Sequence, residues 1–452
     1  MNKIPAIAIF DIGKTNKKLV LFNEQYQLVY ETSTQLLETK DEDGDPCEDV
    51  DQLTLWVRNS FNDILRDERF SIKAVNVSAY GASFVYLDEK DKILLPLYNY
   101  LKPYPQGLLD KFYKDYGNEN IISKETTSPP LGSLNSGLQI YRIKYEKPEV
   151  FEKIKYALHL PQYISYVLSS QENSEITSIG CHTYLWDFSK HDYHSWVYEE
   201  QLDEKFPAIK SSDSLAGQTE NGIPVGVGLH DSSAALIPYL ISFAEPFVLL
   251  STGTWNITLN PFNHNPLTVS ELQSDCLCYL SYDGKPVKAS RLFAGYEHED
   301  FIKKLALYFN KPIDFYKSIL YDPSFLSERN NETSFQDSQL SIQNLKTFKN
   351  YERPYHHFIS DLILKQVESL KIVLRNTEVK KIFVDGGFSS NNVFMPILAQ
   401  AFPGFEVCGA SVSQASALGA ALVVHRHWNT TDLPANLVDF KYYSSAKERD
   451  SL

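Results

Sequence analysis

Short apolar runs that end in polar, glycine-bearing turns recur along the chain. Residues 6–10 are all apolar, a polar segment follows at 11–18, and residues 19–22 are apolar again, which predicts a β-hairpin. Residues 247–259 repeat this layout around a turn at 251–254, and the apolar run 381–384 leads into a third such turn at 385–391. The repeated layout predicts a duplicated α/β fold with a cleft between its halves.

Apolar positions spaced three and four residues apart predict helices between these strands. Alternation or continuous apolar runs predict further strands at 72–78, 225–229 and 407, and a second hairpin formed by residues 85–88 and 92–97. Residues 314–353 are polar with little periodicity, which predicts exposed helices and loops. The boundary between the two domains is expected near residues 241–245. The predicted helices span residues 51–66, 138–145, 148–155, 162–168, 357–375, 393–402 and the small-residue segment 413–428.

Composition narrows the class of protein. The 452 residues are 43% hydrophobic and 22% charged, as in ordinary globular proteins of two or three domains. The net charge of −14 argues against nucleic-acid or membrane partners. The first apolar run is too short for a signal peptide and ends in an acid. Five scattered cysteines predict reduced thiols in the cytoplasm. Cys276 and Cys278 form a single pair with no second pair elsewhere in the sequence, which argues against a zinc site.

Asp231 lies between a glycine-bearing turn and a run of small residues typical of a helix start. An acid at a helix N-cap accepts backbone N–H bonds and faces the positive end of the helix dipole. That setting favours the ionised carboxylate, which can take a proton from a substrate hydroxyl. A simple capping role is the alternative. His230 has the same two interpretations, either a substrate contact or a hydrogen-bonded core histidine.

The three glycine-bearing turns offer chemistry suited to phosphate. Glycine allows close approach of the backbone, and consecutive N–H groups form a nest for anions. Lys14 or Lys18 can balance phosphate charge, although Lys17 and Lys18 are also typical of solvated hairpin charges. Asp11 leaves a strand end, where a carboxylate can hold Mg²⁺ directly or through water. A Walker A sequence is absent from the chain, which disfavours a P-loop fold.

Taken in order, the motifs resemble those of the FGGY carbohydrate kinases of the actin-like ATPase superfamily. Phe-Asp-Ile-Gly-Lys-Thr-Asn-Lys-Lys at 10–18 resembles their first phosphate motif, and Gly-Leu-His-Asp-Ser-Ser-Ala-Ala at 228–235 resembles their catalytic segment. Leu-Ser-Thr-Gly-Thr-Trp at 250–255 is similar to the second phosphate motif. The segments at 385–391 and 414–421 are similar to the adenosine motif. The resemblance spans residues 5 to 425 and is closest to the rhamnulokinase and L-fuculokinase branch, where a histidine precedes the catalytic Asp.

The resemblance implies an α/β fold of two actin-like (ribonuclease H-like) domains with mixed sheets flanked by helices and an ATP/sugar cleft between them. The expected domains are residues 1–243, with the sugar site, first phosphate turn and catalytic Asp, and residues 244–430, with the second phosphate turn and adenosine site. Residues 431–452 are expected to be a C-terminal tail.

The same resemblance implies site roles by position. Asp231 matches the catalytic base, and Asp11 matches a residue of the Mg²⁺ shell. Sugar contacts are expected from Gly81, His230, Asp231 and Ser232. The residues expected to contact ATP are Gly13, Lys14, Thr15, Asn16, Lys18, Thr252, Gly253, Thr254, Gly386, Gly387 and Asn391.

The implied activity is ATP- and Mg²⁺-dependent phosphorylation of a ketose of the L-rhamnulose or L-fuculose type by a cytoplasmic monomer or homodimer. Three alternatives stay open: xylulose or ribulose as the sugar, an actin-like ATPase without a sugar substrate, and a non-catalytic sugar- or nucleotide-binding relative.

Several positions depart from the family pattern and bear on sugar identity. Residues 98–102 read Tyr-Asn-Tyr-Leu-Lys where many relatives carry an Asp and an Arg that contact the sugar. Gln414 replaces a frequent Glu, and residues 80–83 lack the Gln-His of xylulokinases. Arg291 lies near the position of a sugar-binding Asn in rhamnulokinases. Three of the many tyrosines are candidates for the cleft: Tyr80, Tyr98 and Tyr296.

Overall fold

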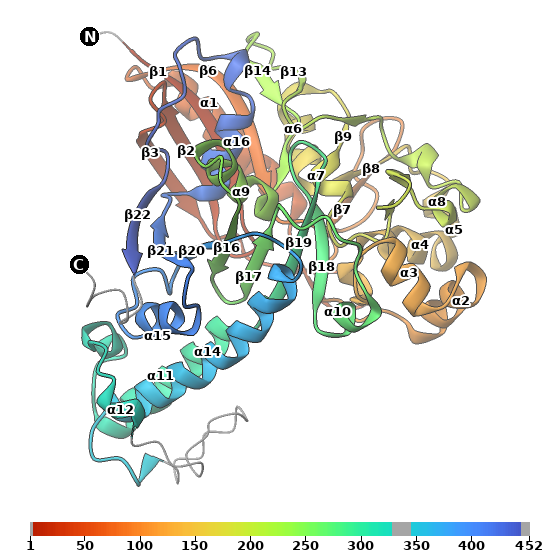
Figure 1. Cartoon of the computed structure of the whole chain (residues 1–452). Coiled ribbons are helices and arrows are strands. Elements are labelled where there is room, and N and C mark those ends of the chain that lie inside the picture. The colour runs from red at the N-terminus through yellow and green to blue at the C-terminus, as the bar shows by residue number, and fades with distance from the viewer. Residues whose placement is uncertain (1–2, 328–344, 444–452) are drawn as a thin grey trace.

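The computed structural model describes residues 3–327 and 345–443, and its two large sheets form the two halves of the molecule (Figure 1). The first sheet has the order β13-β14-β6-β1-β2-β3, with β15 also paired to β6. Its strands are β1 (Ile4–Ile12), β2 (Lys17–Asn23), β3 (Leu28–Thr34), β6 (Phe70–Ala79), β13 (Leu215–Gln218), β14 (Pro224–Gly226) and β15 (Leu229–His230). We call this sheet with helices α1–α9 the N-terminal lobe.

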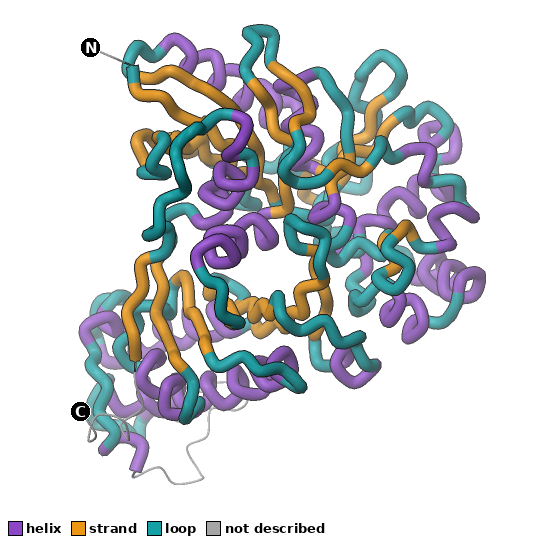
Figure 2. Tube along the Cα trace, turned by 45° about the horizontal axis from the view of Figure 1, so that its top comes forward, coloured by secondary structure: helices purple, strands orange, loops and turns teal. Residues whose placement is uncertain are grey.

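The second sheet has the order β18-β19-β17-β16-β20-β21-β22. Its strands are β16 (Phe247–Thr252), β17 (Asn256–Asn260), β18 (Cys276–Leu280), β19 (Pro286–Leu292), β20 (Lys381–Gly386), β21 (Glu406–Ser411) and β22 (Asp439–Tyr443). We call this sheet with helices α10–α16 the C-terminal lobe. Both sheets carry the predicted hairpins, since β1 pairs antiparallel with β2 and β16 pairs antiparallel with β17. Figure 2 shows the two groups of strands as separate orange layers.

The predicted helical segments are present apart from some ends, but the structure also has helices that the sequence did not predict, among them those at 106–116, 119–125 and 294–309. In the N-terminal lobe they are α1 (Val50–Arg66), α2 (Gln106–Tyr116), α3 (Glu119–Glu125), α4 (Ser136–Glu146), α5 (Pro148–Phe151), α6 (Leu160–Ser169), α7 (Ile176–Ile179), α8 (Ser195–Glu199) and α9 (Asp231–Ser242). In the C-terminal lobe they are α10 (Val269–Gln273), α11 (Ala294–Phe309), α12 (Ser324–Ser327), α14 (Glu352–Leu374), α15 (Phe394–Ala401) and α16 (Ala415–Val423). None of these described helices is long and apolar enough to cross a membrane.

Helices α9 and α16 join the two lobes by lying between the sheets (Figure 1). Helix α16 packs against β1 and β6 of the first sheet, whereas α9 turns Tyr239 toward Phe383 of the second, with ring centroids 5.5 Å apart. The small residues predicted at 413–428 allow this close approach. A Cβ added to Gly419 would lie 1.8 Å from the carbonyl oxygen of Ala234. The two helix starts are therefore fixed beside the facing ends of both sheets.

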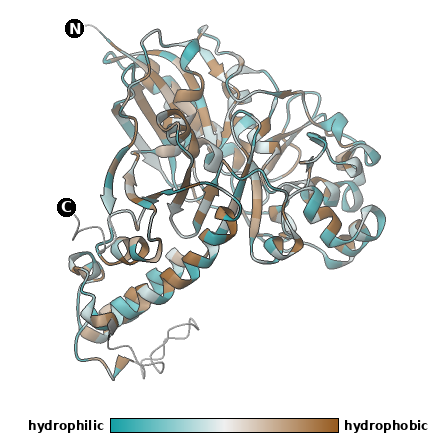
Figure 3. Cartoon of the chain, viewed as in Figure 1, coloured by the Kyte–Doolittle hydropathy of each residue, from teal (hydrophilic) through white to brown (hydrophobic). Residues whose placement is uncertain are grey.

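The hydrophobic cores lie on the faces of the sheets, and Figure 3 shows apolar segments along the strands of both. The five cysteines are free and buried.

Four predictions of local structure were wrong or incomplete. The strand β7 (Phe84–Leu87) pairs with β8 (Tyr156–His159), and the predicted hairpin partner at 92–97 makes only an isolated bridge through Ile93. Helix α5 ends at Phe151, one turn after it begins, although the sequence predicted a helix to residue 155. The predicted strand 225–229 is divided into β14 and β15. In the expected C-terminal tail, β22 adds an antiparallel edge strand to the second sheet. Part of the predicted polar segment 314–353 lies outside the described residues.

The remaining short strands form two-stranded ribbons away from the main sheets: β4 (Thr39–Lys40) with β5 (Pro46–Cys47), β9 (Ser174–Glu175) with β12 (Ile209–Lys210), and β10 (Trp186–Asp187) with β11 (Asp192–Tyr193).

Candidate active site

Asp231 begins helix α9 directly after β15, which extends the first sheet beside the end of β6. It is the first helical residue, and His230 occupies the N-cap position, so Asp231 is not the predicted cap. One carboxylate oxygen accepts the backbone N–H of Ser232 at 2.6 Å. The Asp231 side chain is 35% exposed, which leaves it accessible from solvent.

Burial raises the pKa of Asp231 to about 6, against the lowering effect of its bonds to Ser232. The sequence predicted the opposite direction, because it considered the helix end and not the surrounding protein. Desolvation of the charged form outweighs the helix start. At neutral pH the carboxylate is still mostly ionised, and a base with a pKa near the working pH is well suited to proton transfer.

Asp11 lies near the end of β1, opposite Lys18 on β2. Its carboxylate accepts a hydrogen bond of 3.0 Å from the hydroxyl of Ser416, at the start of α16. Burial and the charge of Asp231 raise the pKa of Asp11 to about 6, with Ser416 and Lys18 acting in the opposite direction. Two desolvated carboxylates from different strand ends thus face one region where the lobes meet. The sequence did not assign a role to Ser416, and a serine in a helical segment gives no signal of it.

The first turn contains three lysines with different surroundings. Lys17 is buried: its ammonium donates to the carbonyl oxygens of Gly13 at 3.1 Å and Lys14 at 2.9 Å, and it pairs with Glu48. The prediction that Lys17 is a solvated charge was therefore wrong. The ion pair and the two hydrogen bonds of Lys17 fix the backbone of the turn from its buried side.

Lys18 and Lys14 lie on the outside of the same turn. Lys18 is 27% exposed and donates to the side-chain oxygen of Gln414 at 2.8 Å, across the lobes. Lys14 turns toward Glu38, with their charged atoms 2.8 Å apart. Thr15 and Asn16 are exposed at the tip, which the Gly13 N–H closes by donating to the Asn16 carbonyl at 2.9 Å. Lys18 is thus the lysine of this turn that reaches the other lobe.

His230 is buried beside Asp231, with its Nε2 atom 3.4 Å from the nearer carboxylate oxygen. Burial lowers the pKa of His230 to about 4, so the imidazole is neutral at physiological pH. The ring packs on Gly81, where an added Cβ would lie 2.8 Å from the ring carbon Cδ2. Gly81, His230, Asp231 and Ser232 are therefore brought together as the sequence predicted, with Gly81 and His230 in direct contact.

Tyr100 also approaches this site from the segment that departs from the family pattern. Its pKa is raised by burial first and then by the charge of Asp231. Tyr80 packs against Tyr100 with ring centroids 5.9 Å apart and donates its hydroxyl to Glu48 at 2.6 Å. An aromatic ring thus stands near the base where many relatives carry an acid.

The second turn exposes Gly253 and Thr254 between β16 and β17. Thr252 is buried instead: its hydroxyl donates to the carbonyl oxygen of Asp385 and accepts the Phe388 N–H at 2.9 Å. Thr252 therefore binds the second and third turns to each other, while Thr254 is the threonine open to solvent.

The third turn carries exposed Gly386, the last residue of β20, and exposed Gly387. The Gly387 N–H donates to the Thr252 carbonyl at 3.0 Å, and Tyr239 of α9 donates to the Asp385 carboxylate at 3.0 Å. Asn391 is 9% exposed, and its side-chain oxygen accepts the N–H groups of Val393 and Phe394. Its side-chain nitrogen donates to the Tyr355 hydroxyl at 2.7 Å, so these contacts fix the turn just before α15, which begins at Phe394.

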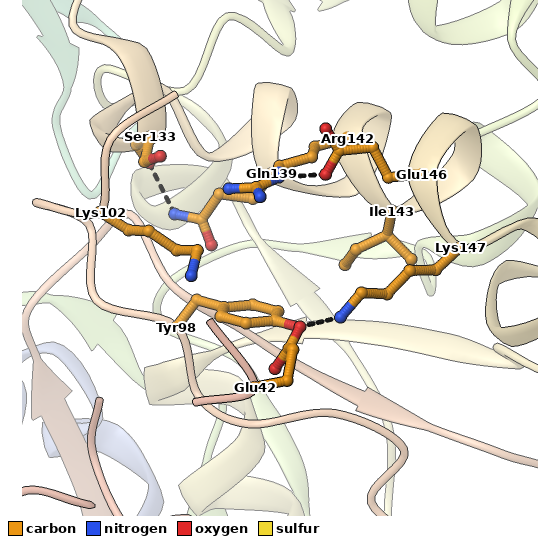
Figure 4. Close-up of a pocket in the computed structure, with 9 residues that line it drawn as sticks. All are labelled: Glu42, Tyr98, Lys102, Ser133, Gln139, Arg142, Ile143, Glu146 and Lys147. Carbon is orange, nitrogen blue, oxygen red and sulfur yellow. Dashed lines mark hydrogen bonds and ion pairs between the residues drawn. The ribbon is translucent and has the colours of Figure 1, made fainter. Parts of the chain in front are cut away.

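Tyr98, a predicted cleft candidate, lies in a separate pocket (Figure 4). The charges there are paired within the protein: Lys102 with Asp41, Asp43 and Asp45, Arg142 with Glu146, and Lys147 with Glu42. Gln139 links this pocket to the active site, since its amide donates to the Ala82 carbonyl at 2.6 Å, next to Gly81. Tyr296 is 53% exposed and stacks on Phe293, with centroids 4.6 Å apart.

Two family models together cover most of the chain. The model described as FGGY family of carbohydrate kinases, N-terminal domain, matches residues 6–237. The model described as Carbohydrate kinase FGGY, C-terminal domain, matches residues 244–432.

Among curated relatives, a rhamnulokinase of Halalkalibacterium halodurans is 24% identical over 280 residues, which are 58% of this chain and 57% of the relative. A rhamnulokinase of Mannheimia succiniciproducens is 24% identical over 266 residues, 56% of this chain and 52% of the relative. The chain thus spans about half the length of the curated relatives it matches.

Solved structures share the whole fold at low identity. A carbohydrate kinase from Novosphingobium aromaticivorans superposes with a TM-score of 0.79 at 20% identity, covering 98% of this chain and 95% of the other. A ligand-bound xylulose kinase from Lactobacillus acidophilus gives a TM-score of 0.77 at 14% identity, covering 99% and 95%. The predicted α/β fold of two actin-like domains is confirmed. From the two matching domain models, this chain belongs to the FGGY family of carbohydrate kinases.

Proposed function

We propose that the protein is an ATP-dependent sugar kinase that phosphorylates a hydroxyl of a ketose of the L-rhamnulose or L-fuculose type. The observation that carries the proposal is the Asp231 carboxylate, partly exposed at the start of α9, with neutral His230 at 3.4 Å and Asp11 facing the same region. The rhamnulokinases among the relatives support the choice of sugar class.

In the proposed mechanism, Asp231 accepts the proton of the attacking sugar hydroxyl. The oxygen of that hydroxyl bonds to the γ-phosphorus of ATP, and the bond from the γ-phosphorus to the β–γ bridging oxygen breaks. Neutral His230 and the backbone beside Gly81 orient the sugar. Lys18 and the exposed backbone of the turns at 13–16 and 253–254 contact the phosphates. The chain thus acts mainly by positioning and charge stabilisation.

Asp11 and its surroundings suit a Mg²⁺ ion. Mg²⁺ is typically bound by one or two carboxylates together with waters and substrate phosphates. The desolvated Asp11 carboxylate, whose pKa is raised to about 6, is a donor that a divalent cation would stabilise. Such an ion would neutralise charge on the transferring phosphoryl group.

The proposal is tested by measuring ADP release with Mg²⁺ and ATP in the presence of L-rhamnulose, L-fuculose, L-ribulose, D-ribulose or D-xylulose. Stimulation by one of the first two sugars, with a stoichiometric sugar phosphate product, is the expected result. Preference for xylulose or ribulose would contradict the sugar class. ATP hydrolysis that no sugar stimulates would indicate an actin-like ATPase, and binding without turnover would indicate a non-catalytic relative.

A further inference from the structure

His182 forms part of a wall of three rings beside Asp231. It lies in the loop between α7 and β10 of the N-terminal lobe. Its ring centroid is 6.0 Å from that of His230 and 6.0 Å from that of Tyr279 on β18 of the C-terminal lobe. His230 and Tyr279 are themselves 5.5 Å apart. Residues of both lobes therefore meet next to the proposed base, on its His230 side.

Three ring nitrogens of this wall lack hydrogen-bond partners among the described residues. Both ring nitrogens of His182, which is 8% exposed, and the Nδ1 atom of His230 are buried without a partner in the described part of the chain. Buried polar atoms are nearly always bonded, so an unsatisfied group needs an explanation. Two other buried histidines are bonded: His159 to Ser136 at 3.0 Å and His298 to Tyr355 at 3.1 Å.

The charge state of the wall indicates which ligand it suits. Burial lowers the pKa of both His182 and His230, so both rings are neutral near pH 7. A neutral imidazole has one N–H donor and one acceptor nitrogen. A hydroxyl group both donates and accepts, and it can satisfy either nitrogen, whereas a carboxylate can only accept. Arg291, a cation whose charge reaches His182, is already bonded to Asp275 through Nη2 at 2.5 Å.

We propose that His182 is an acceptor-binding and specificity-determining residue, which bonds to a hydroxyl of an uncharged polyhydroxy sugar other than the one that Asp231 deprotonates. The inference rests on the proposed function and deepens it. The acceptor lies against the wall that His182 and His230 of one lobe form with Tyr279 of the other. Sugar acids are excluded because the wall provides no unpaired positive charge to a carboxylate.

The test uses the full-length variants His182→Leu and His182→Gln with the ketose that the wild type prefers. We expect the KM for the sugar to rise about 3- to 10-fold in His182→Leu, as for the loss of one neutral hydrogen bond, with the KM for ATP changed less than twofold. The ratio of kcat/KM between ketose stereoisomers should also change. His182→Gln, which keeps a donor and an acceptor, should recover part of the lost affinity.

The melting temperature without ligand distinguishes a structural role of His182 from a sugar-binding role. His182→Leu removes two unpaired buried polar atoms, so its melting temperature should equal or exceed that of the wild type. The matched control is His356→Leu on α14, a fully buried histidine whose Nδ1 bonds to the Glu352 carbonyl and whose Nε2 accepts the Asp322 N–H. This control should lower the melting temperature and leave the sugar KM unchanged.

Several outcomes overturn the inference. If the wild type phosphorylates a ketose but His182→Leu keeps its sugar KM and stereoisomer ratio, His182 is not an acceptor-binding residue, although the proposed function stands. If D-gluconate is phosphorylated more efficiently than every ketose, the uncharged class is wrong. If no sugar turns over, calorimetric binding of the ketose panel decides: binding that His182→Leu weakens supports the inference without the kinase function, and absence of binding refutes it.

Discussion

The two sheets share one topology but provide different chemistry. In the first, β3-β2-β1-β6-β14 runs as two antiparallel pairings followed by two parallel ones, and β19-β17-β16-β20-β21 repeats that sequence in the second. The equivalent turns nevertheless differ: residues 11–18 carry one acid and three lysines, whereas residues 251–254 have no charged side chain. Topology therefore sets where a turn lies, and its side chains determine what it can do.

Each turn is also held by a different kind of buried side chain. Lys17 supports the first with a buried ammonium paired to Glu48, and Thr252 supports the second with a neutral hydroxyl bonded to Asp385 and Phe388. In both, a less buried residue lies on the outside of the turn: Lys18, 27% exposed, in the first and Thr254 in the second. Charge is thus concentrated in the first of the two turns, and replacing charged groups there should have the larger effects.

The largest effect is expected for Asp231→Asn. Asn preserves shape but cannot accept the proton, so kcat should fall about 100- to 10,000-fold, while the dissociation constant of ATP changes less than twofold. ADP release and calorimetry measure the two quantities. Asp385→Asn is the control at a strand end of the other lobe, where the carboxylate accepts from Tyr239 and Gly386; its kcat should fall less than tenfold. Retention of a tenth of wild-type turnover in Asp231→Asn would refute the role of the base.

A large loss of stability is expected for Lys17→Met. The substitution leaves the Glu48 carboxylate and two turn carbonyls without their buried partner, which should lower the free energy of unfolding by about 3 kcal/mol. Thr252→Val, its counterpart in the second turn, should cost about 1 to 2 kcal/mol. Urea denaturation followed by circular dichroism measures both. Equal losses in the two variants would contradict the contrast between a charged and a neutral support.

Smaller effects are expected on the KM for ATP when the residues on the outside of the two turns are replaced. Lys18→Met should raise the KM for ATP about 10- to 100-fold, because a hydrogen bond to a charged phosphate contributes about 1.5 to 3 kcal/mol. Thr254→Val should raise it by less than tenfold. Lys14→Met is the matched control within the same turn, since Lys14 is directed to Glu38; its KM should change less than threefold. Steady-state kinetics at fixed sugar measures all three, and a larger effect for Lys14 than for Lys18 would reverse the assignment.

The local pattern of the sequence was sufficient for the hairpins of the two main sheets and for many helices, because each depends on neighbours a few residues away, although it missed α2, α3 and α11. It failed where a partner lies far along the chain. The strand β7 pairs with β8 some 70 residues later, so its predicted hairpin with residues 92–97 did not form. The burial of Lys17 depends in the same way on Glu48, which the turn sequence cannot reveal.

For the active site, motif order was enough to predict which residues meet around Asp231, and the structure brings Gly81, His230 and Ser232 to it. The electrostatics were not predictable, because desolvation depends on the packing of both lobes and reversed the expected pKa shift. His182 and Tyr279 were missed for a related reason. They come from different lobes, and no spacing in the sequence links them.

The smallest predicted effect concerns stability and pH at Asp231. Its folded pKa of about 6 lies above the ordinary value of 3.8, so protonation favours the folded state at low pH, and this contribution is lost as pH rises through 6. Asp231→Asn should therefore be more stable than the wild type at pH 8, and the advantage should shrink at pH 5 and vanish below pH 4. Because the side chain is 35% exposed, we expect a difference of only about 1 kcal/mol between pH 8 and pH 4. Urea denaturation at the three pH values measures it. If the stability of Asp231→Asn relative to the wild type is lower at pH 8 than at pH 5, the protein stabilises the ionised carboxylate, which would contradict the raised pKa.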